Sequence, residues 1–358
     1  IIKGSADSLE DFRAACEDPD FVLQYGVANG AVEIAEQRRI PMAFAFPYPY
    51  RPTREFPSFM VPWRGSLGGA YNLWTQKAVQ KVSWNGYGVA RRRWRAERFG
   101  LAPWPSFRAM VDSRRPYRTP TLYCYSPQVV PKPPDWEDTD QVTGFWLLDP
   151  PVNWTPAPAL ERFLASGPPP VYVGFGSMPL ASAERCTRDV LRALEITGQR
   201  GLLLASGGGA MVRLPAPPSV MFVESIPFSW LLPRLAAVVH HGGAGTVASS
   251  LHAGIPSVVM PMALDQFAWA RLIEDRGIGV RGARLEKLTA EGLASSIDRV
   301  INDSTLRSRA AAFGEKIRAE RGVTNAVEAI ERHALEFRAM ETAMDRTGGL
   351  HRPGRRTS

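Results

Sequence analysis

The stretch that decides the fold is VHHGGAGTVASSLHAGIPSVVMPMALDQ, residues 239–266. An apolar run over residues 236–239 ends in His240 and His241, and five small residues precede a segment compatible with a helix. Glycines let the backbone approach a bound group closely, and the start of a helix presents unpaired N–H groups with positive dipole character. The segment therefore predicts an anion site at the carboxyl end of a strand, with His241 and Thr246 as additional side-chain donors.

A second strand-to-loop transition follows in the same stretch. The apolar residues 257–260 end at Pro261, which leads to Asp265 and Gln266. Ligands of open α/β sheets bind outside the carboxyl ends of the strands, so the two transitions predict one site. A carboxylate beside an amide suits the hydroxyls of a sugar, although an aspartate in this position can also act as a helix N-cap. The two roles are compatible, and we expect sugar binding to be the main one.

Three further segments occur around this block in a fixed order. They are FPS at 56–58, VTGFW at 142–146 and PPVYVGFGSM at 169–178. Together with HHGGAGT and the later DQ, they resemble glycosyltransferase family 1, and most closely the branch of sterol glucosyltransferases and antibiotic-tailoring glycosyltransferases. The resemblance implies an α/β chain of the GT-B fold, with two Rossmann-like, doubly wound parallel-sheet domains, the N-terminal one incomplete.

The resemblance also assigns roles to individual residues. The residues expected to bind the donor phosphates are Ser177, His241, Gly243, Ala244, Gly245 and Thr246. Asp265 and Gln266 are expected to bind the donor sugar, whereas His240 should point the other way along the strand. Backbone groups of Ile226 are expected to pair with the nucleobase. Ser249 stands where plant members have a ribose-binding glutamate, so both UDP and dTDP stay open.

The activity implied is inverting transfer of a sugar, most simply glucose, from a UDP-sugar to a hydroxyl of a sterol-like or other lipophilic acceptor. The catalytic base is unassigned, because the resembling enzymes carry it in a loop after the first strand and nothing before Phe21 matches that loop. We expect about a hundred residues of a full enzyme to lie upstream. Two rival hypotheses are a UDP-sugar epimerase of the same fold and a non-catalytic module that binds nucleotide sugars or lipids. An epimerase would need several carboxylates in its cleft for acid–base catalysis, and Asp265 is the only candidate that the sequence offers.

The pattern of apolar residues predicts how the chain is organised. Residues 21–46 indicate a strand, a helix and a parallel strand. Residues 68–99 show helical periodicity with a break at Asn85-Gly86, and 121–126 indicate another strand. We expect a partial N-terminal acceptor-binding domain at 1–150 with a proline-rich linker from about 127. A C-terminal nucleotide-sugar-binding domain at 151–325, a helix crossing back at 326–345 and a disordered tail at 346–358 complete the prediction.

The net charge of +8 is concentrated between Arg51 and Arg118, where fourteen Lys and Arg face three acids. Half of the ten tryptophans also lie there. This pattern fits three interpretations: a solvated helix face over core tryptophans, peripheral contact with an anionic membrane or lipidic acceptor, and nucleic-acid binding. We expect no nucleic-acid partner, because no stacking module is visible.

Neither a metal nor a cofactor is expected. The acidic pairs Asp18/Asp20 and Asp138/Asp140 follow no convincing buried strand, so we predict solvated loops for both. Cys16, Cys124 and Cys186 are widely spaced and predict buried thiols in a reducing cytoplasm. The expected location is therefore the cytoplasm, where the basic segment 51–118 would contact the inner face of the membrane if its lipid interpretation holds.

Overall fold

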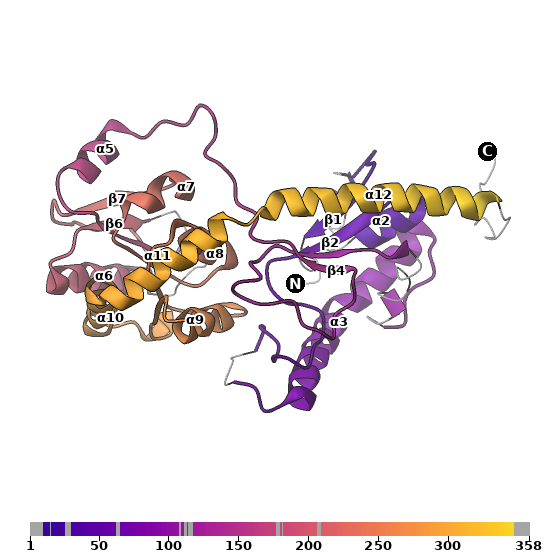
Figure 1. The fold of residues 1–358 in the computed structure, drawn as a ribbon, viewed down its shortest axis with the longest axis horizontal. Coiled ribbons are helices and arrows are strands. Elements are labelled where there is room, and N and C mark those ends of the chain that lie inside the picture. Colours follow the sequence, from indigo (N-terminus) through magenta and orange to yellow (C-terminus); the bar gives the residue numbers. More distant parts are fainter. Residues whose placement is uncertain are drawn as a thin grey trace.

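The structure is a computed structural model. It describes residues 10–14, 16–25, 30–61, 65–106, 109–110, 113, 117–176, 180, 182–205 and 209–346, without the side chains of 86–90 and 344–346. Two α/β domains, each built on a parallel sheet, lie side by side along the long axis (Figure 1). The expected fold class is therefore confirmed.

The N-terminal sheet has four parallel strands in the order β1-β2-β3-β4. They are β1 (Val22–Tyr25), β2 (Met42–Phe46), β3 (Thr121–Tyr123) and β4 (Asp140–Val142). Helix α2 (Ala31–Arg38) connects the first two strands, and α3 (Gly69–Phe99) lies between the second and the third. The strand-helix-strand unit expected over residues 21–46 is thus present.

Two local expectations for this domain are wrong. Helix α3 continues through Asn85-Gly86 for 31 residues, because a glycine costs only about 1 kcal/mol in a helix and the following turns bury Trp94 and Phe99 in the domain core. The supposed linker contains β4, which pairs in parallel with β3 in the register Thr121↔Asp140. Asp140 is fully buried rather than solvated, because Arg51 pairs with its carboxylate at 2.7 Å.

The C-terminal sheet has six parallel strands in the order β10-β9-β8-β5-β6-β7. The strands are β5 (Val171–Gly174), β6 (Gly201–Leu204), β7 (Val220–Val223), β8 (Ala237–His240), β9 (Ser257–Val259) and β10 (Gly279–Arg281). The helices are α5 (Pro158–Ala165), α6 (Ala183–Thr197), α7 (Phe228–Leu231), α8 (Ala244–Ala253), α9 (Gln266–Asp275), α10 (Ala290–Asn302) and α11 (Ser304–Arg318), with short 3-10 turns η2 (Leu232–Arg234) and η3 (Leu285–Lys287). β8 is a central strand between β5 and β9, so its carboxyl end adjoins those of both neighbours.

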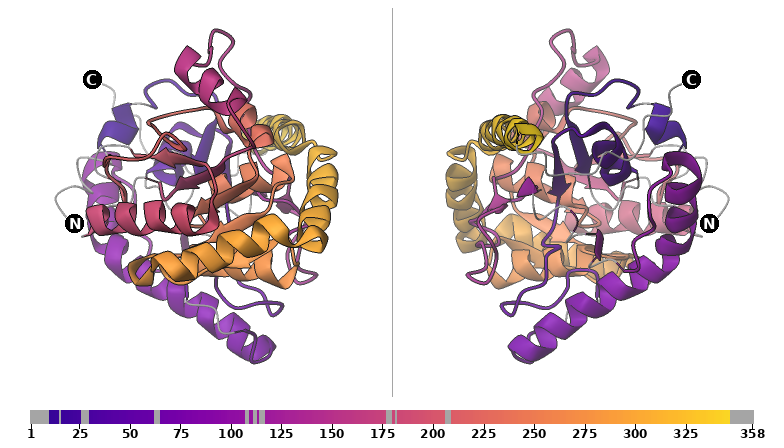
Figure 2. Two further views of the ribbon diagram at one scale, coloured as in Figure 1. Left: turned by 90° about the vertical axis from the view of Figure 1, so that its left-hand side faces the viewer. Right: turned by 90° about the vertical axis from the view of Figure 1, so that its right-hand side faces the viewer.

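The last helix, α12 (Gly322–Arg346), lies on the N-terminal domain although it follows the C-terminal one (Figure 2). Its residues Ala326 and Ala329 pack against Ala43 of β2 and Leu122 of β3. The side-chain amide of Asn325 donates to the carbonyl oxygen of Thr143 at 2.9 Å. The predicted tail falls almost wholly outside the described residues.

One apolar cluster is shared by the two domains. It contains Phe59 and Tyr125 from the N-terminal side with Trp269 and Ile273 of α9 from the C-terminal side. Burial of apolar surface stabilises by about 25 cal/mol per Å², so a core shared in this way holds the domains together. The carboxyl ends of the strands in the two sheets are thereby brought near one another.

Candidate donor-binding site

His240 is the last residue of β8 and is fully buried. Its Nδ1 accepts a hydrogen bond from the backbone N–H of Gly242 at 3.1 Å. Burial, with a smaller contribution from His241, lowers the pKa of His240 to about 3, so the ring is neutral. Its Nε2 has no hydrogen-bond partner among the described residues. His240 therefore stabilises the turn at Gly242 from within the domain core.

His241 lies between two glycines of different loops. A Cβ on Gly176, in the loop after β5, would be 2.9 Å from its Cε1, and a Cβ on Gly243 would be 2.5 Å from its Nε2. Only glycine leaves room for the ring at these positions. Burial lowers the pKa of His241, and its Nδ1 has no partner within the described ranges. The ring is thus a neutral imidazole, with one N–H donor and one acceptor nitrogen, at the junction of two strand ends.

Helix α8 begins directly behind His241. Gly243 is its N-cap residue and supplies no side chain to cap it, and the first turn contains no acidic residue. The first N–H groups of a helix lack intrahelical acceptors and favour an anion. A Cβ on Gly245 would meet nothing within 4 Å, and Thr246 is partly exposed beside it. The arrangement can receive a phosphate group; Ser177, expected at the same site, lies outside the described residues.

Asp265 and Gln266 begin α9 after the strained residue Leu264, which has a φ of 55°. The carboxylate of Asp265 does not cap the helix; its Oδ2 accepts from the indole N–H of Trp269 at 2.8 Å. Burial raises the pKa of Asp265, and the Trp269 bond opposes that shift. The Oε1 of Gln266 accepts from the backbone N–H groups of Met262 and Ala263, at 2.8 and 3.0 Å. Gln266 thus holds the loop that presents Asp265.

Two tyrosines of the N-terminal domain, which the sequence analysis missed, lie near Asp265. Tyr25 is at the carboxyl end of β1 and Tyr48 follows β2. Burial raises the pKa of both hydroxyls, to about 12 for Tyr25, and the charge of Asp265 adds to the shift of each. The charge of Asp265 thus acts on groups at the strand ends of the N-terminal sheet. Tyrosines at strand ends are a signal that could have indicated them.

The residues expected to hold the nucleoside lie on two elements. Ile226 lines a pocket of about 200 Å³ at the carboxyl ends of β6 and β7, together with Tyr172 and Phe228, whose rings meet edge to face at 5.5 Å. Ser249 lies one turn into α8, and its hydroxyl donates to the carbonyl oxygen of Gly245 at 3.0 Å. The pocket has a mixed lining, with Glu224 and Ser225 beside the two aromatic rings.

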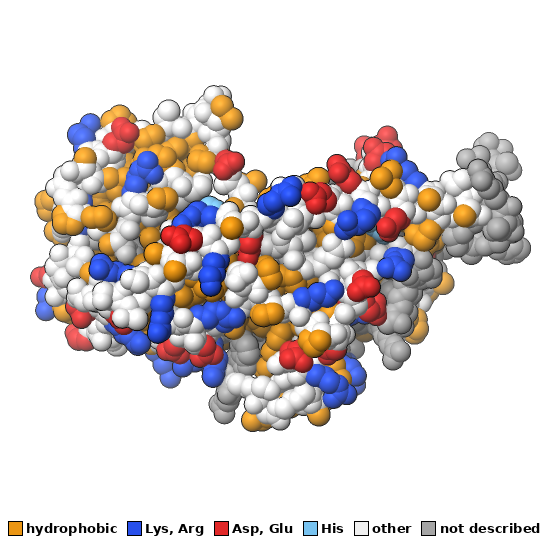
Figure 3. All heavy atoms as spheres, in the orientation of Figure 1, with side chains coloured by type: hydrophobic (Ala, Val, Ile, Leu, Met, Phe, Trp, Pro, Cys, Tyr) orange, Lys and Arg blue, Asp and Glu red, His pale blue; other side chains and the backbone are white. Residues whose placement is uncertain are grey.

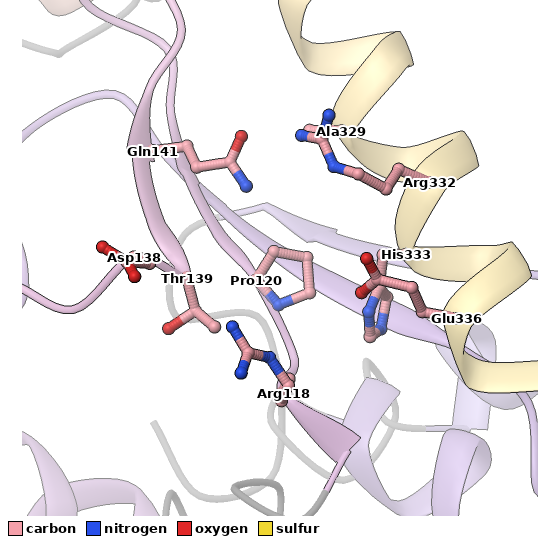
Figure 4. A pocket seen from close by; sticks show the side chains of 9 residues that line it. All are labelled: Arg118, Pro120, Asp138, Thr139, Gln141, Ala329, Arg332, His333 and Glu336. Carbon is pink, nitrogen blue, oxygen red and sulfur yellow. The ribbon is translucent and has the colours of Figure 1, made fainter. Parts of the chain in front are cut away.

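A second pocket, of about 290 Å³, lies at the opposite edge of the N-terminal sheet (Figure 4). Arg118 and Thr139, which precede β3 and β4, face Arg332 and Glu336 of α12 across it. It lies at the amino ends of these strands, remote from the residues predicted to bind the donor. Its charges are of both signs, and it is not the site that the sequence predicts.

The basic side chains of residues 51–118 do not all lie on the surface. Arg91 and Arg95 are buried, and they pair with Glu33 at 2.6 Å and Glu36 at 2.7 Å. On the face drawn in Figure 3, basic and acidic side chains alternate over both domains. Two of the fourteen basic side chains of this segment are therefore buried in ion pairs, whereas others, such as Lys77 and Lys81, are exposed.

Asp18 and Asp20 are exposed, as predicted, and no group of three or more metal-ligating side chains occurs among the residues that the structure describes. None of the described helices has both the length and the apolar character that a membrane span needs.

A known protein family matches the part of the chain that contains the candidate donor residues. Residues 209–332 match the C-terminal domain of the erythromycin biosynthesis protein CIII-like family. The matched segment includes β8, α8, β9 and α9, and so every candidate donor residue except Ser177.

The similarity to whole proteins covers most of the chain. The chain is 34% identical over 343 residues to a sterol 3-beta-glucosyltransferase of Emericella nidulans, and the alignment covers 92% of this chain and 24% of that protein. It is 35% identical over 355 residues to the protein of the same name from Cryptococcus neoformans, covering 92% of this chain and 22% of that protein. The chain thus spans about a quarter of the length of these curated relatives.

Solved structures show the same fold. The glycotransferase of kitacinnamycin superposes with a TM-score of 0.65 at 20% identity, covering 93% of this chain and 82% of that one. The spinosyn forosaminyltransferase SpnP gives 0.63 at 16% identity, covering 91% and 80%. All these relatives are named as glycosyltransferases, so neither the epimerase nor the binding-module hypothesis is favoured.

Proposed function

The chain is a homologue of sterol 3-beta-glucosyltransferases with the GT-B fold, and we propose that it transfers a sugar from a nucleotide-sugar donor to a hydroxyl of a lipophilic acceptor. The donor we propose is UDP-glucose and the acceptor a sterol-like molecule. The observation that carries this proposal is the neutral imidazole of His241, which lies between the loops after β5 and β8 at the open start of α8.

In this proposal, the diphosphate lies against the start of α8. The backbone N–H groups from Gly243 to Thr246 and one N–H of His241 donate to its oxygens, and Ser177 joins them. The helix dipole supports the negative charge that grows as the nucleoside diphosphate leaves, so no metal ion is needed. The nucleobase of the donor enters the pocket at Ile226, and Ser249 lies on the side of the ribose.

Asp265 and Gln266 hold the hydroxyls of the donor sugar. The acceptor then lies between Asp265 and the tyrosines of the N-terminal domain. Neither Tyr25 nor Tyr48 serves as the base at neutral pH, because the ordinary pKa of a tyrosine is already about 10 and desolvation raises the pKa of both hydroxyls further. The base that deprotonates the acceptor is therefore another group.

Calorimetry and a transfer assay test the proposal together. UDP and UDP-glucose should bind in EDTA as tightly as in Mg²⁺, and dTDP should bind more weakly than UDP. Glucosylation of a sterol by the chain in its natural full-length context would complete the test. Binding that EDTA abolishes would contradict the metal-free site, and absence of binding to either nucleotide would refute the donor site.

We further propose a cytoplasmic location with peripheral contact to the membrane. The first half of α3 projects from the domain and is exposed at Trp74 and Val82, with Lys77 and Lys81 on the same side of the helix (Figure 1). Residues 56–96 contain no acid. An aromatic and basic helix face of this kind suits an anionic lipid surface, and the three free thiols suit a reducing compartment.

A further inference from the structure

Trp269 holds the carboxylate that is proposed to bind the donor sugar. It lies four residues after Asp265, and residues at that spacing share one helix face. Its side chain is fully buried, and its indole N–H donates to Oδ2 of Asp265 at 2.8 Å. Asp265 therefore has a fixed orientation only as long as the indole does.

The indole ring is packed by the other domain. Phe59 meets it edge to face, with ring centroids 5.4 Å apart and an interplanar angle of 79°. Tyr125 lies on it at 6.3 Å and 65°. Both rings belong to the N-terminal domain and are almost fully buried. The C-terminal side chain that orients Asp265 is thus held by N-terminal residues.

The far end of the same helix is attached to the N-terminal domain as well. The guanidinium of Arg276, which follows α9, donates to the carbonyl oxygens of Gln128 and Val129. Helix α9 is therefore contacted by the N-terminal domain at both ends. A change in the contact between the domains would be transmitted to Asp265 through Trp269.

We propose that Trp269 is a positioning residue that makes recognition of the donor sugar depend on the contact between the two domains. The inference rests on the donor-sugar role of Asp265 given under the proposed function. The phosphate contacts of His241 and α8 are made by C-terminal elements and do not pass through the indole. Binding of UDP should therefore be independent of Trp269, whereas binding of UDP-glucose should require it.

The variant Trp269→Phe tests this, because it removes the N–H but keeps an aromatic ring against Phe59 and Tyr125. Calorimetry on the whole chain should show UDP-glucose bound about tenfold more weakly, with UDP affinity within about twofold of the original, since a hydrogen bond to a charged group is lost. Trp136→Phe is the matched control. Trp136 is buried in the same cluster, but its indole nitrogen has no partner among the described residues, so both affinities should stay unchanged.

Two further measurements separate positioning from a general structural role. In an Asp265→Asn background, Trp269→Phe should weaken UDP-glucose binding no further. With Asp265 intact, the variant should move the acid limb of UDP-glucose binding to higher pH, because the N–H bond that lowers the Asp265 pKa is gone.

The outcomes are distinguishable. Equal losses for UDP and UDP-glucose, or UDP-glucose binding that is unchanged in Trp269→Phe, would overturn the role of Trp269. If the unchanged chain bound neither UDP nor UDP-glucose, the proposed donor site itself would fail, and the inference with it. The same would follow if the Asp265→Asn variant bound both ligands as tightly as the unchanged chain.

Discussion

Two pairs of polar side chains, one in each domain, are satisfied in different ways. In the N-terminal domain, the guanidinium of Arg91 forms a two-point contact with Glu33 at 2.6 and 2.8 Å, between α3 and α2. In the C-terminal domain, His240 and His241 are neutral, and each keeps a ring nitrogen without a partner among the described residues, at the end of a central strand. Buried charges that satisfy one another hold a fold together, whereas unsatisfied polar atoms at a strand end are available to a ligand.

The largest effect should come from breaking the buried pair. Glu33→Gln leaves the Arg91 guanidinium buried without its counter-charge, which should cost about 3–5 kcal/mol of unfolding free energy. Urea denaturation measures it. Arg93→Gln is the control, because its pair with Glu97 is exposed and should contribute little to stability. Similar losses in the two variants would mean that the pair is not what stabilises the N-terminal domain.

A smaller effect is expected at the ligand edge. His241→Ala should weaken UDP binding by about 1.5–3 kcal/mol, the range for a hydrogen bond to a charged group. His252→Ala, at the other end of α8, should leave the affinity unchanged. Calorimetry gives both values. If the two variants bound UDP equally well, the unsatisfied imidazole would have to be explained by something other than the donor phosphate.

The sequence predicted the C-terminal site in outline because glycines and a histidine at a strand end allow few arrangements. The close contact of His241 with Gly243 follows from that spacing, but its contact with Gly176 needed the three-dimensional order of β5 and β8. The bond from Trp269 to Asp265 is local, at i and i+4, and could have been predicted.

The N-terminal domain was harder to predict for physical reasons. Strand β4 has three residues within a proline-rich segment, so no periodicity revealed it. Its first residue, Asp140, is a charge that can be buried because Arg51 and the backbone N–H of Glu137 both bind its carboxylate. The arginines of α3 indicated a basic surface, because their partners Glu33 and Glu36 lie on a helix far away in the sequence. Long-range pairing of charges is invisible to composition.

A third prediction sharpens the contrast by testing the space around His241. Gly243→Ala places a methyl group 2.5 Å from the imidazole, which must shift. We expect a loss of roughly 1–2 kcal/mol of unfolding free energy, within the range for overpacked sites. Gly245→Ala, two residues on, meets open space and should cost nothing or stabilise slightly, because alanine favours a helix. Thermal denaturation of the two variants in parallel would reveal the difference; identical midpoints would mean that the ring moves freely.

The smallest effect concerns the basic side chains of the N-terminal domain that are exposed and take no part in the buried ion pairs. Lys77→Gln should weaken binding to vesicles containing phosphatidylserine by about 1 kcal/mol, the contribution of one basic residue near an anionic surface. The loss should shrink as salt is added, because exposed charges are screened. Lys132→Gln, which removes the same charge from an exposed loop elsewhere in the domain, should have no effect. Vesicle sedimentation measures the partition. Equal losses for both lysines would assign the attraction to net charge alone, and the face of α3 that carries Trp74 would then be only a solvated helix surface.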